Sequence, residues 1–240
     1  MWPGGERVGV ILQARMGSTR LPGKVMRPLE GRPLIAWVVE RLQAIEGVDG
    51  VVLATSRAET EAPLIAWARA EGLPCFRGDE HDVLDRYVQC MEAYGLDAVV
   101  RATGDNPLLC PIEASRLVDL YRRTNVDYAT NVTSDGSGLP IGAGLEVFGA
   151  EALRVSASEG LEPHHREHVN EFIRERPARF RRRVQFALPE HCAPKLSLTV
   201  DTPEDFAAME ACYRAHRDDG GIGPVPLSWV VARHRVEGIA

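Results

Sequence analysis

The twelve residues QARMGSTRLPGK at positions 13–24 combine several residue types that bind anions. Two glycines let backbone amides approach a phosphate closely, and three side chains carry positive charge: Gly17, Gly23, Arg15, Arg20 and Lys24. The spacing differs from the ATP-binding Walker loop, because five residues separate the glycines and Val25 stands where a hydroxyl would hold Mg²⁺. The stretch therefore indicates a phosphate-binding loop of another kind, or a solvated basic loop.

Two aspartates follow apolar runs that read as strands: Asp105 in VVRATGDNP and Asp201 in LSLTVDTPED. In a parallel sheet such strand ends meet at one edge, where ligands bind. Thr202 and Asp205 fit a helix start, as N-cap and as the carboxylate three residues later, but this does not account for Asp201. Each aspartate alone also fits a cap or a surface turn. Together, opposite a basic loop, they predict Mg²⁺ bound to a polyphosphate.

Strands and helices must alternate along the chain to bring these segments to one edge. Unbroken apolar runs predict strands at 8–14, 50–55, 74–77 and 97–103. Apolar residues at helical spacing predict helices at 33–45, 59–71, 82–95 and 111–124. We expect Asp82 to be the N-cap of the third helix. Buried strands that alternate with helices predict an α/β fold, with a mixed, mostly parallel sheet and helices on both faces.

The alternation breaks near Asn131, where the chain becomes rich in Gly, Ser and Pro. We interpret residues 131–195 as an insert within a single domain over 1–240. Short strands and two helices are expected there, one of them including the Arg-rich stretch RERPARFRRR. Inserts of this kind are often the place where such folds dimerise. The α/β pattern resumes with a strand at LSLTV and a final helix.

The composition limits the class of protein. The chain has 240 residues, 45% of them hydrophobic, which is enough for one large domain. A net charge of −6 argues against a nucleic-acid partner. The five cysteines form no CxxC pair, and neither a long apolar run nor a signal-peptide layout is present, so we expect a cytoplasmic protein without a membrane partner. Lys24 and Lys195 are the only two lysines, and all other basic residues are arginines. This bias indicates that positions 24 and 195 need a compact ammonium rather than a planar guanidinium.

Six motifs occur in the order found in one family: ILQARMGSTRLPGKVM, FRGDEHDVLDRY, ATGDNPL, EVF at 146–148, REHV and TVDTPEDF. On these motifs the chain resembles the cytidylyltransferases that make CMP-activated sugar acids, such as acylneuraminate and Kdo cytidylyltransferases. The branch that it resembles most belongs to spore-coat polysaccharide biosynthesis. The resemblance implies a Rossmann-like nucleotide-diphospho-sugar transferase fold and a homodimer formed through the insert. It also implies a Mg²⁺-dependent reaction of CTP with a sugar acid, giving a CMP-sugar and diphosphate.

The resemblance implies roles for single residues as well. The nucleotide-binding residues would be Gln13, Ala14, Arg15, Gly17, Ser18, Arg20, Lys24, Arg77 and Arg101, with the last two facing the cytosine. The catalytic set would be Arg15, Lys24, Asp105 and Asp201, with the two aspartates binding Mg²⁺. On the acceptor side would lie Glu146 and Arg166. Two positions depart from the family. Gly144 occupies a position where the family often has an acidic residue, and Ser197 one where it often has an arginine. Lys195, on the same strand face, could supply the charge of that arginine.

Three other functions stay open at this point. The stretch HHREH contains His164, Glu167 and His168 in the HxxEH pattern of inverted zinc proteases, which needs both histidines on one helical face. The second is a glycosyltransferase of similar fold that uses a nucleotide-sugar. Such enzymes usually hold their metal with a DxD pair of aspartates, whereas the GDN motif at 104–106 has one aspartate. The third is a binding protein that has lost catalysis.

Overall fold

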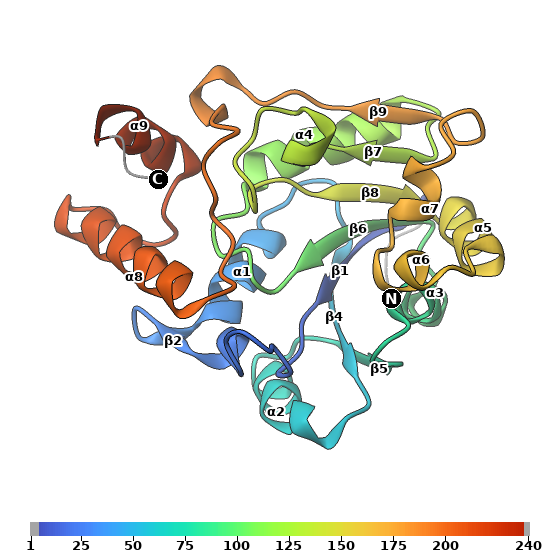
Figure 1. Ribbon diagram of the computed structural model, residues 1–240, viewed down its shortest axis with the longest axis horizontal. Helices are drawn as coiled ribbons and strands as arrows, with labels where there is room; N and C mark the ends of the chain where they lie inside the picture. Colours follow the sequence, from blue (N-terminus) through green and yellow to red (C-terminus); the bar gives the residue numbers. More distant parts are fainter. Residues whose placement is uncertain (1–4, 238–240) are drawn as a thin grey trace.

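Seven strands form one sheet in the order β5-β4-β1-β6-β8-β7-β9 (Figure 1). The computed structural model describes residues 5–237, so the ends of the predicted 1–240 domain lie outside it. The strands are β1 (Val8–Gln13), β4 (Gly50–Ser56), β5 (Cys75–Gly78), β6 (Ala98–Thr103), β7 (Tyr128–Thr130), β8 (Glu146–Gly149) and β9 (Arg182–Val184). Neighbouring strands are parallel except where β8 pairs with β6 and β7. The predicted mixed, mostly parallel sheet is confirmed.

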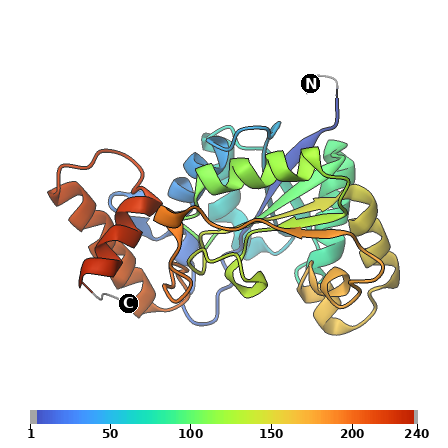
Figure 2. The same cartoon turned by 90° about the horizontal axis from the view of Figure 1, so that it is seen from above.

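Helices cover both faces of this sheet (Figures 1 and 2). They are α1 (Leu34–Gln43), α2 (Ala62–Ala70), α3 (Val83–Tyr94), α4 (Pro111–Arg123), α5 (Ala150–Glu159), α6 (Pro163–Glu167), α7 (Glu171–Arg174), α8 (Pro203–Asp218) and α9 (Leu227–Glu237). One buried apolar cluster joins the sheet to α1 and α4, and a second joins it to α3 and α5. A hairpin of β2 (Pro28–Leu29) and β3 (Arg32–Pro33) lies beside α1. None of the described helices is both long and apolar enough to cross a membrane.

The register of the central strands fixes where the loops begin. Val10 and Leu12 of β1 pack into one apolar cluster and Ile11 into the other, so both faces of the strand are buried. At the end of β1, Gln13 pairs with Ala54 of β4 and Thr103 of β6. Strands β1 and β6 therefore end level and β4 runs two residues further, so the loops that follow them start from one edge of the sheet.

Both predicted helix starts are confirmed. The carboxylate of Asp82 accepts the amide N–H of Asp85 at 2.9 Å at the start of α3. At the start of α8, Thr202 and Asp205 form a capping box. Each cap satisfies amides that the first helical turn leaves without a partner. The capping box also fixes the chain directly after Asp201.

Two predicted elements are wrong. The run LSLTV forms no strand of the sheet, because its backbone bonds to loops instead: Leu198 N–H to the carbonyl of Ile141 at 2.8 Å, and Val200 N–H to the carbonyl of Asp105 at 2.9 Å. The Arg-rich stretch is not helical after its first residue, Arg174. Helix α7 ends at Arg174, since Pro177 disfavours a continued helix, and the chain then forms β9 beside β7.

Candidate active site

Lys24 lies between the two aspartates that the sequence predicts as metal ligands. Its ammonium donates to Asp105 Oδ2 at 3.0 Å, to Asp201 Oδ1 at 2.9 Å and to the carbonyl oxygen of Val200 at 2.8 Å. Lys24 is 8% exposed. Arg20 adds a second positive charge 3.2 Å from Asp201 Oδ1. The structure thus brings four of the predicted site residues into one cluster of two cations and two carboxylates, here called the lysine cluster.

A buried carboxylate holds the loop that carries Lys24. Glu61, which is 1% exposed, accepts the amide N–H of Met16 at 3.0 Å and the hydroxyls of Thr55 and Ser56 at 2.9 and 3.3 Å. Hydrogen bonds to a charged group are stronger than neutral ones, so this contact anchors the loop to the end of β4. Sequence reasoning missed Glu61, because it lies far from the loop along the chain and has the appearance of a helix-start residue.

Each aspartate is oriented by its neighbours. The hydroxyl of Thr103 donates to Asp105 Oδ1 at 2.6 Å. A Cβ on Gly104 would approach the Cβ of Ala14 to 2.8 Å, so the glycine allows the two loops to lie in contact. Next to Asp201, burial acts to raise the pKa of Asp205, but the amides of Asp201 and Thr202 that it accepts bring that pKa below its usual range. Asp205 is therefore a fixed anionic brace behind Asp201.

A cavity of about 590 Å³ opens beside the loop, and we call it the α6 cavity. Its lining includes Gln13, Arg15, Arg86, Arg101 and Arg166. Three buried polar atoms of these residues have no hydrogen-bond partner: Gln13 Oε1, Arg86 Nε and Arg101 Nε. Buried polar groups rarely lack a partner, so these atoms mark a polar wall. The α6 cavity thus has the polar and cationic lining that suits an anionic ligand, and Arg86 is a lining residue that sequence reasoning missed.

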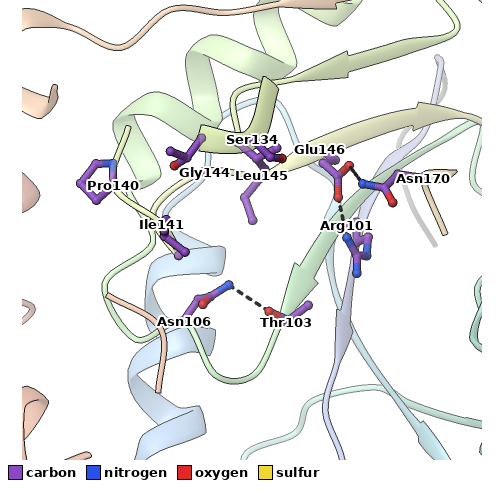
Figure 3. Close-up of a pocket in the computed structure, with 13 residues that line it drawn as sticks. Arg101, Thr103, Asn106, Ser134, Pro140, Ile141, Gly144, Leu145, Glu146 and Asn170 are labelled. Atoms are coloured by element: carbon purple, nitrogen blue, oxygen red, sulfur yellow. Dashed lines mark hydrogen bonds and ion pairs between the residues drawn. The ribbon is translucent and has the colours of Figure 1, made fainter. Parts of the chain in front are cut away.

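A second cavity of about 480 Å³, the β8 cavity, lies between the end of β6 and the start of β8 (Figure 3). At its base Glu146, 3% exposed, accepts from Arg101 Nη1 at 2.6 Å, from Asn170 Nδ2 at 2.7 Å and from the hydroxyl of Tyr128. Three donors satisfy the hydrogen-bonding capacity of this buried side chain. The remaining lining includes hydroxyl and amide side chains from Thr103, Asn106, Thr133 and Ser134.

Arg101 belongs to the linings of both cavities. Burial acts to lower the pKa of this guanidinium, but the adjacent carboxylate of Glu146 raises the pKa of Arg101 above its usual range. Arg101 is therefore a permanent cation at the junction of the two cavities. The sequence resemblance had it facing a cytosine, and that role stays a prediction.

The loop before β8 is closed on itself. Asn131 N–H donates to the carbonyl of Leu145 at 3.1 Å, and Leu145 N–H donates to Asn131 Oδ1 at 2.7 Å. Gly144 lies inside this closure, where an added Cβ would meet the carbonyl oxygen of Asn131 at 2.4 Å. The acidic residue expected at this position from the family has no space here.

Other predicted residues lie apart from the lysine cluster. Arg77 is exposed and donates to the carbonyls of Ser56 and Arg57 at 3.3 and 2.6 Å, and it lines neither cavity. Arg166 binds Asp82 Oδ2 at 2.8 Å on the wall of the α6 cavity, whereas Glu146 lies in the β8 cavity. The predicted replacement of an arginine by Lys195 fails, because Lys195 lies in an exposed turn rather than on a strand face.

The geometry that a zinc protease needs is not formed. Helix α6 ends at Glu167, and His168 has extended dihedrals, φ −112° and ψ 101°. His164 and His165 instead bond to the two carboxylate oxygens of Glu175 at 2.7 and 2.8 Å. His164 and His168 therefore do not share a helical face, and the zinc-protease alternative loses its structural basis.

The family profile described as cytidylyltransferase matches residues 9–217. This chain belongs to the cytidylyltransferase family. The cytidylyltransferase is 40% identical over 211 residues to the spore coat polysaccharide biosynthesis protein SpsF of Bacillus subtilis. The alignment covers 85% of each chain. It is 32% identical over 149 residues to a 3-deoxy-manno-octulosonate cytidylyltransferase of Yersinia pseudotuberculosis, covering 60% of this cytidylyltransferase and 56% of that relative. The resemblance to the spore-coat branch is confirmed, and the protein is a nucleotidyltransferase.

Solved structures agree with the fold of this cytidylyltransferase. A cytidylyltransferase from Leptospira borgpetersenii superposes with a TM-score of 0.88 at 26% identity, over 98% of this chain and 96% of that one. A CMP:2-keto-3-deoxy-manno-octonic acid synthetase complexed with CTP gives a TM-score of 0.68 at 21% identity, over 88% and 100% of the two chains. At that identity the second likeness concerns the fold alone.

Proposed function

We propose that this cytidylyltransferase transfers CMP from CTP to a sugar acid and releases diphosphate. The observation that carries the proposal is the lysine cluster, whose cations and carboxylates lie beside two cavities that share Arg101. Relatives named 3-deoxy-manno-octulosonate cytidylyltransferase support a sugar acid as the acceptor, and the cytidylyltransferase family profile supports CTP as the nucleotide. We also propose a homodimer through residues 131–195, as the family resemblance implies, and a cytoplasmic location, as the composition predicts.

Asp105 and Asp201 would hold the Mg²⁺ that the family implies. Mg²⁺ prefers one or two carboxylates together with phosphate oxygens, and these two side chains offer that donor set around a single cation position. When bound there, Mg²⁺ would neutralise the triphosphate and polarise the α-phosphorus.

The residues of the chain do the rest by holding the two substrates together. Arg15 and Arg20 bind the β- and γ-phosphates, and the amides of the loop that Glu61 anchors add further donors. The hydroxyl and amide groups of the β8 cavity orient the acceptor hydroxyl toward the α-phosphorus. The acceptor hydroxyl loses its proton to solvent, a bond forms between its oxygen and the α-phosphorus, and the bond from that phosphorus to the diphosphate oxygen breaks. Arg101 lies where the two cavities meet.

Diphosphate release tests the proposal. Purified protein with Mg²⁺, each of the four nucleoside triphosphates in turn and a panel of sugar acids should release diphosphate with CTP and at least one acid. The Asp201→Asn variant should lose this activity, whereas Glu204→Gln, which removes an exposed carboxylate three residues away, should keep it. Release with another triphosphate in place of CTP, or full activity of Asp201→Asn, would overturn the assignment.

A further inference from the structure

Every N–H donor of the Lys24 ammonium is in use. An ammonium has three donors, and the lysine cluster offers it three acceptors, Asp105 Oδ2, Asp201 Oδ1 and the carbonyl of Val200, at 2.8 to 3.0 Å. The side chain is 10% exposed, so solvent competes little for these bonds. While the cluster is intact, Lys24 therefore has no donor left for a phosphate oxygen.

The cluster is also balanced in charge without any metal. Lys24 and Arg20 supply two positive charges, and Asp105 and Asp201 supply two negative ones. The oxygens that the ammonium contacts belong to the carboxylates that a divalent cation needs. A divalent cation at those carboxylates would lie close to the ammonium, and repulsion between two cations is strong where water is partly excluded.

We infer that Lys24 keeps the metal site closed until a triphosphate arrives. The inference rests on the proposed function. A triphosphate brings several anionic oxygens to the loop, and Lys24 and Arg20 turn toward them and release Asp105 and Asp201. The divalent cation therefore enters with the nucleotide, and the cation alone is excluded. Lys24 thus has two successive partners, the aspartates in the free enzyme and the phosphates in the complex.

The two lysines of the chain make this visible in the wild-type protein. Protein labelled with ¹³C at the lysine ε-carbon should give one signal from Lys24 and one from Lys195, and Lys195→Met assigns them. Millimolar Mg²⁺ alone should leave the Lys24 signal in place. Mg²⁺ with CTP, or with inorganic tripolyphosphate, should shift the Lys24 signal and not that of Lys195. A shift with Mg²⁺ alone, or no shift with both triphosphates, overturns the inference.

Mn²⁺ binding to the nucleotide-free protein is the second measurement. Lys24→Met should bind Mn²⁺ about tenfold or more tightly than wild type, as followed by loss of the free-ion electron paramagnetic resonance signal, since one contacting cation is gone. Arg20→Met removes a more exposed cation and should give a smaller gain, and Lys195→Met should give none. The gain should disappear when Asp201→Asn is added to Lys24→Met. Equal affinity of wild type and Lys24→Met, or a gain that survives Asp201→Asn, overturns the inference.

These experiments separate the inference from the proposed function. The Mn²⁺ measurement contains neither CTP nor an acceptor, so a protein that fails to release diphosphate can still show the gain in Lys24→Met. Conversely, CTP-dependent diphosphate release together with equal Mn²⁺ affinities would refute only the role of Lys24 in closing the site.

Discussion

Glu61 offers a sharp test of how the nucleotide loop is held. The Glu61→Ala variant leaves the amide of Met16 and the hydroxyls of Thr55 and Ser56 without their acceptor in a buried place. Each unpaired group costs about 1–3 kcal/mol, and relaxation lowers the sum, so we expect the free energy of unfolding to fall by about 4 kcal/mol. Glu61→Gln keeps one acceptor oxygen and should cost about 1–2 kcal/mol.

Urea denaturation of the two variants measures both values, and thermal unfolding should show a loss of roughly 8–16 °C for Glu61→Ala in a chain of this size. Since the loop then loses its anchor, the KM for CTP should rise about tenfold or more in Glu61→Ala, and less in Glu61→Gln. A loss of less than about 1 kcal/mol in Glu61→Ala would refute the reasoning. So would an unchanged KM for CTP in a clearly destabilised protein.

Three further changes have defined outcomes. Gly144→Ala should lower the free energy of unfolding by about 1–3 kcal/mol in urea denaturation, because its Cβ would meet the carbonyl oxygen of Asn131 at 2.4 Å; a neutral result would contradict the close approach. Tyr128→Phe removes one of the three donors to Glu146 and should cost about 1–3 kcal/mol, with a rise in the KM for the acceptor and little change for CTP. Hydrogen bonds from His165 and His164 lower the pKa of Glu175 to about 2. Because this pKa is below the unfolded value, the contribution is present above about pH 4.5 and is lost as the pH falls toward 2. Glu175→Gln should flatten the pH dependence of unfolding in that window, and identical profiles would rule the contact out.

The sequence predicts the nucleotide half of the molecule well, because local rules decide it. The runs of β1, β4 and β6 are apolar apart from polar residues in their carboxyl-terminal halves, so they become buried strands whose polar ends lie at one edge. The cap at Asp82 and the capping box at Thr202 use side chains that accept from backbone amides three residues away. Lys24 and Asp105 meet because each follows one of two adjacent strands.

Long-range pairing explains what the sequence leaves out. Asp201 reaches the site although the run before it is no strand of the sheet, because Val200 bonds to the backbone of Asp105. Glu61, Arg86 and Asn170 take part through burial in a tertiary environment, and no local pattern distinguishes them from surface residues of the same types. The prediction of a helix in the Arg-rich stretch failed because β7 offered an open edge for pairing.

The closed loop between Asn131 and Leu145 has a consequence for how this architecture diversifies. Its two ends are fastened to each other rather than to the nucleotide loop, and β8 enters the sheet antiparallel, with its first residue at the edge of the site. Within this loop Ile141 bonds through its backbone to Leu196 and Leu198, in the run that leads to Asp201. Residues 132–140 can therefore change in sequence while the lysine cluster keeps its geometry, provided that the pairing of Ile141 is kept. Natural selection can remodel this part of the pocket wall for new acceptors, and protein engineers can graft loops from relatives that preserve the same pairing.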